Sequence, residues 1–248
     1  MKTTLLFNTP LLYAASAIRM SKDNHHLSDS HVVATGCIGC NALMHDGSCS
    51  ENAQDTCENY NTFYKTKVIG EKDKALIDRV GVKMHHESTL EMVDYIWDVE
   101  LSTKTLLALT RHRIGVSMCV RSTRYTTHKL LKNIELFDLN DFEKASMYLE
   151  LGENHEHNRR EIQILNLVIE AVQNGEDNDT ISLLLPQSFI YRAQLKMNAR
   201  SLRHFVSLRN EHTHAHWQIK NLCSRLLSTI PEEHKFLYED VSLPSTSH

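Results

Sequence analysis

The chain has 248 residues, of which 41% are hydrophobic and 23% are charged, with only 8 glycines and 4 prolines. These values are typical of globular proteins and exclude collagen-like, low-complexity and wholly disordered chains. With 27 basic and 31 acidic residues the net charge is −4, so no global positive field attracts a nucleic acid polymer or an anionic membrane. No apolar run reaches the ~20 residues that a membrane span requires, so we expect no membrane partner.

The N-terminal segment resembles a secretion signal only in part. Lys2 precedes an apolar stretch that ends in an Ala-Ser-Ala triplet, but the Asn-Thr-Pro sequence at 8–10 interrupts the stretch. The 6 cysteines are too sparse for a disulfide framework and are compatible with reduced thiols. We therefore expect a cytoplasmic protein.

Residues 22–62 are polar and lack both helical and strand periodicity, so they predict a long loop or insertion. Within it, Cys37, Cys40, Cys49 and Cys57 could bind zinc as a four-thiolate site. The second pair of cysteines is more widely spaced than zinc ligands usually are. We favour free thiols in a loop and expect no metal.

From Asp73 the pattern becomes regular. Apolar residues recur at helical spacing over 76–84, and from Val93 to Leu101 they alternate with polar residues. This predicts a helix followed by a strand with one buried face. Ser102 is a suitable N-cap for the next helix, which brings Arg111-His112-Arg113 to its C-terminal end or just beyond it.

The second half of the chain predicts more helix than strand. Asn140 or Asp141 is expected to cap a long helical region that closes at Gly175. Residues 189–197 alternate and predict a second strand, which ends at Asn198, and two helices with apolar faces follow it. The expected fold class is therefore α+β and rich in helix.

Glycine-rich phosphate loops, the serine-hydrolase elbow and the zinc-protease motif are absent from the sequence. Arginines instead concentrate in two segments beside the predicted strand ends, where guanidinium groups are suited to bidentate binding of phosphate. Solvated helix faces paired with acids explain the same pattern equally well. The arginines are Arg111, Arg113, Arg121, Arg124, Arg200, Arg203 and Arg209.

These two segments resemble the flavin-dependent thymidylate synthases, the ThyX family. The sequence RHRIGVSMCVRSTRY at 111–125 is similar to the RHR signature with its downstream serine, here Ser122. The segment 198–209, which begins Asn-Ala-Arg-Ser-Leu and ends at Arg209, is similar to a second block of the family. Shorter likenesses at 86–91, 185–186 and 231–240 extend the resemblance over about residues 72–240 and leave the insertion outside it.

The resemblance implies a single catalytic domain over 1–248, interrupted by the insertion at about 22–62, with a mostly antiparallel central sheet. It also implies a homotetramer that binds FAD where subunits meet. In the implied reaction, methylenetetrahydrofolate supplies a methylene group to C5 of dUMP, and NADPH-reduced FAD completes dTMP. The family uses no enzyme cysteine as nucleophile, so neither Cys119 nor Cys223 is expected to be catalytic.

Carried over residue by residue, the resemblance gives two catalytic residues. Arg209 is expected to stabilise the pyrimidine ring, and Ser122 is expected to bind the nucleotide. Further nucleotide contacts are expected from Arg111, Val120, Arg121, Thr123 and Arg124. Flavin contacts are expected from Ser88, Arg111, His112, Arg113, Asn198, Arg200, His204 and His214, and His86 is a further folate-side or flavin-side candidate.

Four departures from the family lie near these ligands. Ser182 stands where an arginine or lysine commonly helps to hold phosphate, and His204 replaces the usual asparagine. The loop near Gly115 and the His212-Thr213 segment are each one residue longer. The departures leave open an enzyme that makes another 5-substituted pyrimidine nucleotide, such as a hydroxymethyl product. A third hypothesis is a flavin-binding or nucleotide-binding relative without catalysis, or a zinc-stabilised interaction module.

Overall fold

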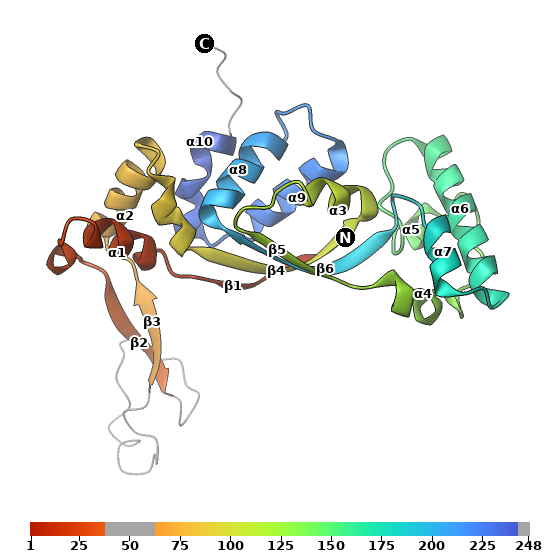
Figure 1. The fold of residues 1–248 in the computed structure, drawn as a ribbon, viewed down its shortest axis with the longest axis horizontal. Coiled ribbons are helices and arrows are strands. Elements are labelled where there is room, and N and C mark those ends of the chain that lie inside the picture. Colours follow the sequence, from red (N-terminus) through yellow and green to blue (C-terminus); the bar gives the residue numbers. More distant parts are fainter. Residues whose placement is uncertain (38–62, 243–248) are drawn as a thin grey trace. The chain divides into compact units, whose positions relative to one another are not determined.

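The structure is a computed structural model that describes residues 1–37 and 63–242. The chain divides into two compact units (Figure 1). The first consists of Met1–Asn8 and Asp94–His248, and the second of Thr9–Val93. All seven arginines singled out above belong to the first unit, which therefore carries most of the candidate site.

The first unit is built on a four-stranded antiparallel sheet in the order β1-β4-β6-β5. Its two central strands, β4 (Asp94–Ser102) and β6 (Ile190–Asn198), pair along their whole length. The edges are β1 (Thr3–Asn8) and β5 (Val116–Val120). Together with the helices below, this sheet confirms the prediction of a helix-rich α+β fold with an antiparallel sheet.

One face of the sheet is buried, as the alternation in the sequence predicts. On β4, Tyr95, Trp97 and Leu101 are 0% exposed, whereas Asp98 on the opposite face binds Arg192 of β6 through both carboxylate oxygens. Figure 1 shows the helices that cover the buried face: α3 (Thr103–Leu109), α8 (Ala199–Arg209) and α9 (Trp217–Ser228). Apolar residues face this layer because burial removes their surface from water.

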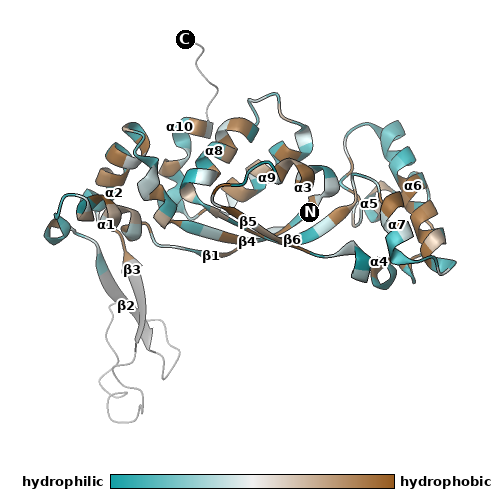
Figure 2. Cartoon of the chain, in the orientation of Figure 1, coloured by the Kyte–Doolittle hydropathy of each residue, from teal (hydrophilic) through white to brown (hydrophobic). Residues whose placement is uncertain are grey.

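A second apolar core lies among α4 (Thr123–Leu131), α5 (Phe142–Ala145), α6 (His155–Gln173) and α7 (Asn178–Leu184). Figure 2 shows the apolar stripe on α6. Leu131, Leu165, Ile181 and Phe189 are at most 1% exposed and pack in this core. The core contacts α4 through Leu131 in its last turn, and α4 packs against α7.

The prediction of one long helical region that closes at Gly175 is wrong in part. Asp141 caps only the four-residue α5, and α6 has its own N-cap, Asn154, whose Oδ1 accepts from the His157 amide at 3.0 Å. Between the two helices Leu149 forms a β-bridge with Phe189. This long-range pairing removes the segment from the helix, and periodicity along the sequence does not report it.

The second unit contains α1 (Leu12–Met20), a 3₁₀ turn (His25–Leu27), β2 (His31–Cys37), β3 (Phe63–Val68) and α2 (Glu71–Ile77). It continues with a π-helical segment (Asp78–Lys83) and a 3₁₀ turn (Glu87–Met92). Strands β2 and β3 pair as an antiparallel hairpin. The loop prediction for 22–62 is therefore wrong over β2, because the strand is specified by its distant partner. Residues 38–62 lie outside the described chain.

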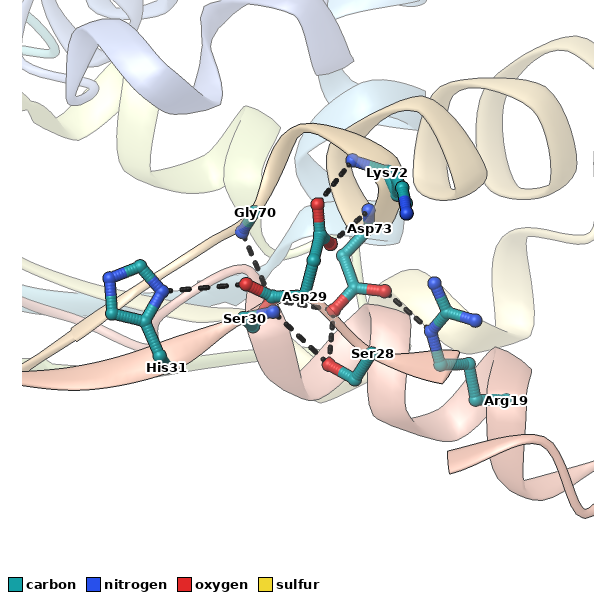
Figure 3. Close-up of polar contacts among 8 residues, drawn as sticks. All are labelled: Arg19, Ser28, Asp29, Ser30, His31, Gly70, Lys72 and Asp73. Carbon is teal, nitrogen blue, oxygen red and sulfur yellow. Dashed lines mark hydrogen bonds and ion pairs between the residues drawn. The ribbon is translucent and has the colours of Figure 1, made fainter. Parts of the chain in front are cut away.

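A buried carboxylate fixes the base of this hairpin (Figure 3). Asp73 accepts from Arg19 Nε at 2.5 Å, from Ser28 Oγ at 2.5 Å and from Ser30 Oγ at 2.6 Å. Burial raises the pKa of Asp73, but these hydrogen bonds outweigh it and hold the pKa below its usual value. Asp29 caps α2 by accepting from two first-turn amides, at 2.8 and 3.0 Å. The start of β2 is thus tied to both α1 and α2.

Candidate active site

The two arginine segments meet where the loop after α3 contacts the start of α8. The Gly115 carbonyl accepts from the Asn198 amide at 3.1 Å, and the Ile114 carbonyl accepts from Ser201 Oγ at 2.7 Å. Gly115 has φ +66°, and a Cβ there would lie 2.3 Å from Ser201 Oγ. Glycine is therefore required for this close approach, which connects the RHR segment with the second block.

Asn198 also begins α8. Its Oδ1 accepts from the Ser201 amide at 2.8 Å, as an N-cap does. This leaves the Nδ2 group of Asn198, which lies next to Gly115, as its remaining donor toward a ligand. Asn198 therefore fixes the start of α8 and also offers a hydrogen-bond donor to a ligand.

His112 lies against the middle of α8. Its half-buried ring makes edge contacts with Phe205 and His204, with centroids 5.2 and 6.0 Å away. Burial, and then the positive charge of Arg209 and the nearby His204, lower the pKa of His112. His112, His204 and Arg209 therefore form one cluster, as the sequence predicts for residues of one site.

Two buried atoms in this cluster have no hydrogen-bond partner among the described residues. They are His112 Nε2 and Arg209 Nε. Buried polar atoms in proteins are nearly always hydrogen-bonded, and an unsatisfied one costs about 1–3 kcal/mol. The cluster is therefore suited to a bound group that supplies hydrogen-bonding atoms.

The second part of the site is the start of α4. Ser122 is the exposed N-cap residue, and its hydroxyl makes no capping hydrogen bond in the described chain. Arg121 is held on β6: its amide donates to the Arg192 carbonyl at 2.9 Å and its Nη2 to the Ile190 carbonyl at 3.2 Å. Burial and the charge of Arg192 lower the pKa of Arg121. Free first-turn amides with nearby guanidinium groups favour an anion.

Arg124, in the first turn of α4, has a protein partner. Its Nε lies 2.7 Å from Asp179 Oδ1, and its Nη2 donates to Oδ2 at 2.9 Å. Asp179 belongs to the first turn of α7, and its carbonyl accepts from Ser182 Oγ at 2.7 Å. The residue that departs from the family pattern thus lies directly beside the Arg124 pair. Sequence reasoning missed Asp179, because only the fold brings α7 against α4.

Most of the remaining predicted residues are at exposed positions, and Val120 and Thr123 are partly buried. Arg111 and Arg113 follow α3, Arg200 is in the first turn of α8, and His214 is in the loop before α9. Ser88 and His86 belong to the second unit, at the 3₁₀ turn Glu87–Met92. Val120 ends β5, and Thr123 begins α4.

Arg203 was grouped with the arginines suited to phosphate, but the structure gives it another role. It is 2% exposed and binds Asp240 in a bidentate pair, with both contacts at 2.7 Å. The sequence contains a signal for this: Ala199, Leu202, Arg203 and Val206 follow the i, i+3, i+4, i+7 pattern of one buried helix face. Arg203 therefore anchors the C-terminal segment rather than a ligand.

In residues 1–37 and 63–242, no group of three His, Cys, Asp or Glu residues lies in a position to hold a metal ion. The zinc hypothesis concerns cysteines whose side chains lie outside the described residues. No helix in the described part of the chain is long and apolar enough to cross a membrane.

Comparison with known proteins bears directly on these observations. A family model described as thymidylate synthase complementing protein matches residues 40–234. The chain is 41% identical over 193 residues to the flavin-dependent thymidylate synthase of Campylobacter jejuni, covering 77% of this chain and 91% of that protein. For the enzyme of Wolinella succinogenes the identity is 38% over 184 residues, covering 74% and 88%.

Solved structures give the same result. The crystal structure of thymidylate synthase X from Helicobacter pylori, solved with FAD and dUMP, matches with a TM-score of 0.76 and 27% identity over 98% of this chain and 99% of that one. A UMP/dUMP methylase from Streptomyces cacaoi matches with a TM-score of 0.58 and 17% identity, and this likeness shows the fold alone. The chain therefore belongs to the thymidylate synthase complementing protein family, the flavin-dependent thymidylate synthases.

Proposed function

We propose that the chain is an FAD-dependent thymidylate synthase that converts dUMP to dTMP. The observation that carries this proposal is the meeting of the two arginine segments at Gly115 and Asn198, which brings His112 and Arg209 together. His112 Nε2 and Arg209 Nε are buried there and have no hydrogen-bond partner among the described residues. Reduced FAD, when bound, would supply the hydride that converts the transferred methylene group into the methyl group of dTMP. The chain's own residues supply binding, orientation and charge.

The His112 cluster fits a flavin. His112 Nε2 and Arg209 Nε are buried and unsatisfied, and the heteroatoms and carbonyl groups of an isoalloxazine ring can complete both. Burial lowers the pKa of His112 and so favours the neutral ring, which can accept or donate at Nε2. The other proposed flavin contacts are Ser88, Arg111, Arg113, Asn198, Arg200, His204 and His214.

The start of α4 fits the nucleotide. The exposed Ser122 hydroxyl and the first-turn amides offer hydrogen bonds to phosphate, and Arg124 and Arg121 offer positive charge. Arg209 faces the pyrimidine in this proposal and stabilises its electron-rich, N3-deprotonated form. Arg111, Val120 and Thr123 complete the nucleotide contacts.

Three further features belong to the proposal. Methylenetetrahydrofolate is the methylene donor, and NADPH reduces the flavin. The active protein is a homotetramer with FAD at subunit contacts. The location is cytoplasmic, in keeping with cysteines too few for a disulfide framework.

The test begins with the absorbance spectrum of the purified protein. It is followed by anaerobic reduction, addition of methylenetetrahydrofolate and dUMP, and mass analysis of the nucleotide. We expect a flavin spectrum and dTMP. A protein that cannot take up FAD, or that holds FAD but forms no new nucleotide, refutes the proposal.

The role of Arg209 is tested by Arg209→Ala. Loss of this charge next to the pyrimidine is expected to cost about 3 kcal/mol of barrier, or roughly a hundredfold in kcat. Arg159→Ala is the control, since Arg159 is an exposed α6 residue that contacts only Asn140 and Glu156 among the described residues. Undiminished dTMP formation by Arg209→Ala contradicts the assigned role.

A different pyrimidine product is the second candidate. It is favoured by Ser182, which places a hydroxyl rather than a cation beside the Arg124 pair, and by His204 in the flavin cluster. Incubation with dUMP and with dCMP, followed by product mass, separates the two candidates. A hydroxymethyl product supports the second candidate, and dTMP as the sole product excludes it.

A further inference from the structure

The guanidinium of Arg124 is already occupied by a carboxylate of the same chain. Asp179 binds it with two contacts, at 2.7 and 2.9 Å, in the arrangement that arginine also uses to bind phosphate. The side chains of Arg124 and Asp179 are 64% and 62% exposed, so a ligand can reach the pair from solvent. Helices α4 and α7 pack together, so the pair does not depend on a mobile loop.

The neighbouring arginines also have partners in the protein. Arg192 binds Asp98 through both carboxylate oxygens, and Arg121 Nη2 donates to the Ile190 carbonyl. Ser182, on the same helix as Asp179, donates its hydroxyl to a backbone carbonyl and adds no positive charge. At the start of α4, the Ser122 hydroxyl makes no capping hydrogen bond with the described residues, and first-turn amides have no acceptor within their own helix. Asp179, the partner of Arg124, is more exposed than Asp98, the partner of Arg192.

A phosphate that binds at the start of α4 must therefore share Arg124 with Asp179 or displace it. The Asp179 carboxylate uses two of the five N–H donors of Arg124, and these include the edge suited to a bidentate acceptor. The carboxylate also places a negative charge close to the incoming dianion. Both effects weaken the binding of a phosphorylated nucleotide, and neither affects a nucleoside without phosphate.

Resting on the proposed function, we infer that Asp179 is a positioning and specificity residue that competes with nucleotide phosphate for Arg124. It sets the affinity of the site for dUMP below the value that the arginine alone would give. Asp179 acts through Arg124 and needs no contact with the reacting atoms.

The test compares binding of dUMP and of 2′-deoxyuridine to the FAD-loaded protein by calorimetry at low salt. Asp179→Asn keeps the shape of the side chain and removes its charge. We expect dUMP to bind about fivefold more tightly, which corresponds to the ~1 kcal/mol that an exposed ion pair can contribute. The affinity for 2′-deoxyuridine is expected to stay unchanged.

Two further variants isolate the pair. Glu176→Gln removes a charge three positions earlier, from an exposed residue whose hydrogen bonds to described residues are made by its backbone, and we expect no change in dUMP affinity. In an Arg124→Ala background, Asp179→Asn is expected to lose its tightening effect. A thermal melt confirms that each variant is folded.

The outcomes separate the inference from the proposed function. A wild-type holoprotein that does not bind dUMP refutes the proposed function itself. If the wild type binds dUMP, then unchanged or weaker binding by Asp179→Asn overturns the competition. An equal change for 2′-deoxyuridine or for Glu176→Gln also overturns it, because the effect would then not pass through phosphate and Arg124.

Discussion

Replacement of Gly115 by alanine tests whether the junction between the two arginine segments builds the flavin site. Gly115 has φ +66°, and its added Cβ would lie 2.3 Å from Ser201 Oγ and 2.4 Å from Asn198 Nδ2. Neither side chain is free to move without loss. Ser201 Oγ donates to the Ile114 carbonyl, and Asn198 Oδ1 caps α8.

The expected cost has three parts. Left-handed backbone in a residue with a Cβ costs roughly 1 kcal/mol. Loss of the hydrogen bond from Ser201 costs about 1 kcal/mol, and disturbance of the Asn198 cap costs about 1 kcal/mol. Gly115→Ala is therefore expected to lower the free energy of unfolding by roughly 3 kcal/mol.

Gly175→Ala is the matched control. Gly175 also has positive φ, +79°, but a Cβ there meets nothing within 4 Å. Its expected cost is the backbone contribution alone, about 1 kcal/mol. Urea unfolding of both FAD-free variants measures the difference, and titration with FAD measures the site. We expect FAD binding at least tenfold weaker in Gly115→Ala and unchanged in Gly175→Ala. Equal destabilisation and equal FAD affinity in the two variants would refute the reasoning.

Burial of titratable groups affects both the stability of the protein and the reactivity of its cysteines. Asp73→Ala leaves Arg19 buried without its carboxylate and is expected to cost about 3 kcal/mol in urea unfolding. Because the folded pKa of Asp73 is lowered, this stabilisation is present above the unfolded pKa and disappears as the pH falls through the folded pKa. His234 is 0% exposed, and burial lowers its pKa to about 4. Between pH ~4 and ~6.5 the unfolded state therefore binds more protons than the folded state. Thermal melts should show that the free energy of unfolding rises over this window by up to ~3 kcal/mol as the pH increases. His234→Asn should flatten this rise. Burial raises the pKa of Cys223 to about 12, whereas Cys119 is exposed. Alkylation at pH 8, followed by peptide mass mapping, should therefore label Cys119 and spare Cys223. Cys119→Ser should retain dTMP formation.

The parts of the fold that sequence reasoning predicts correctly carry local signals. Strands β4 and β6 are central and bury one face, so their residues alternate in polarity, with Ile96 as the exception in β4. Ser102 and Asn198 cap the helices that follow these strands, and each cap involves only the next three residues. Such signals are contained within a short window of sequence.

The parts that were missed depend on distant partners. The edge strands β1 and β5 are short and half exposed, so their patterns are weak. Strand β2 has no alternation of apolar and polar residues in its sequence and is defined by its pairing with β3 across more than twenty-five residues. Leu149 leaves the helical region because it pairs with Phe189. None of these pairings follows from local periodicity.

The candidate site shows the same division. The resemblance identified Arg209, His112 and Ser122 as members of one site, and the structure brings His112 and Arg209 together. The resemblance could not identify the acidic partners, because Asp179 and Asp240 reach Arg124 and Arg203 only through helix packing. The sequence shows an arginine in both cases, so it does not distinguish a guanidinium that is paired with a carboxylate from one that is available to a ligand.

Burial and pairing together separate the roles of these arginines. Arg203 is buried and satisfied by Asp240, so its charge stabilises the fold. Arg124 is exposed and its pair with Asp179 is weak, so a phosphate can compete for it. Arg209 has a buried Nε with no partner among the described residues, which is unfavourable in the free protein. A ligand that forms a hydrogen bond with this atom removes the penalty. The ligand should therefore stabilise the folded protein more than its contacts with exposed residues alone would.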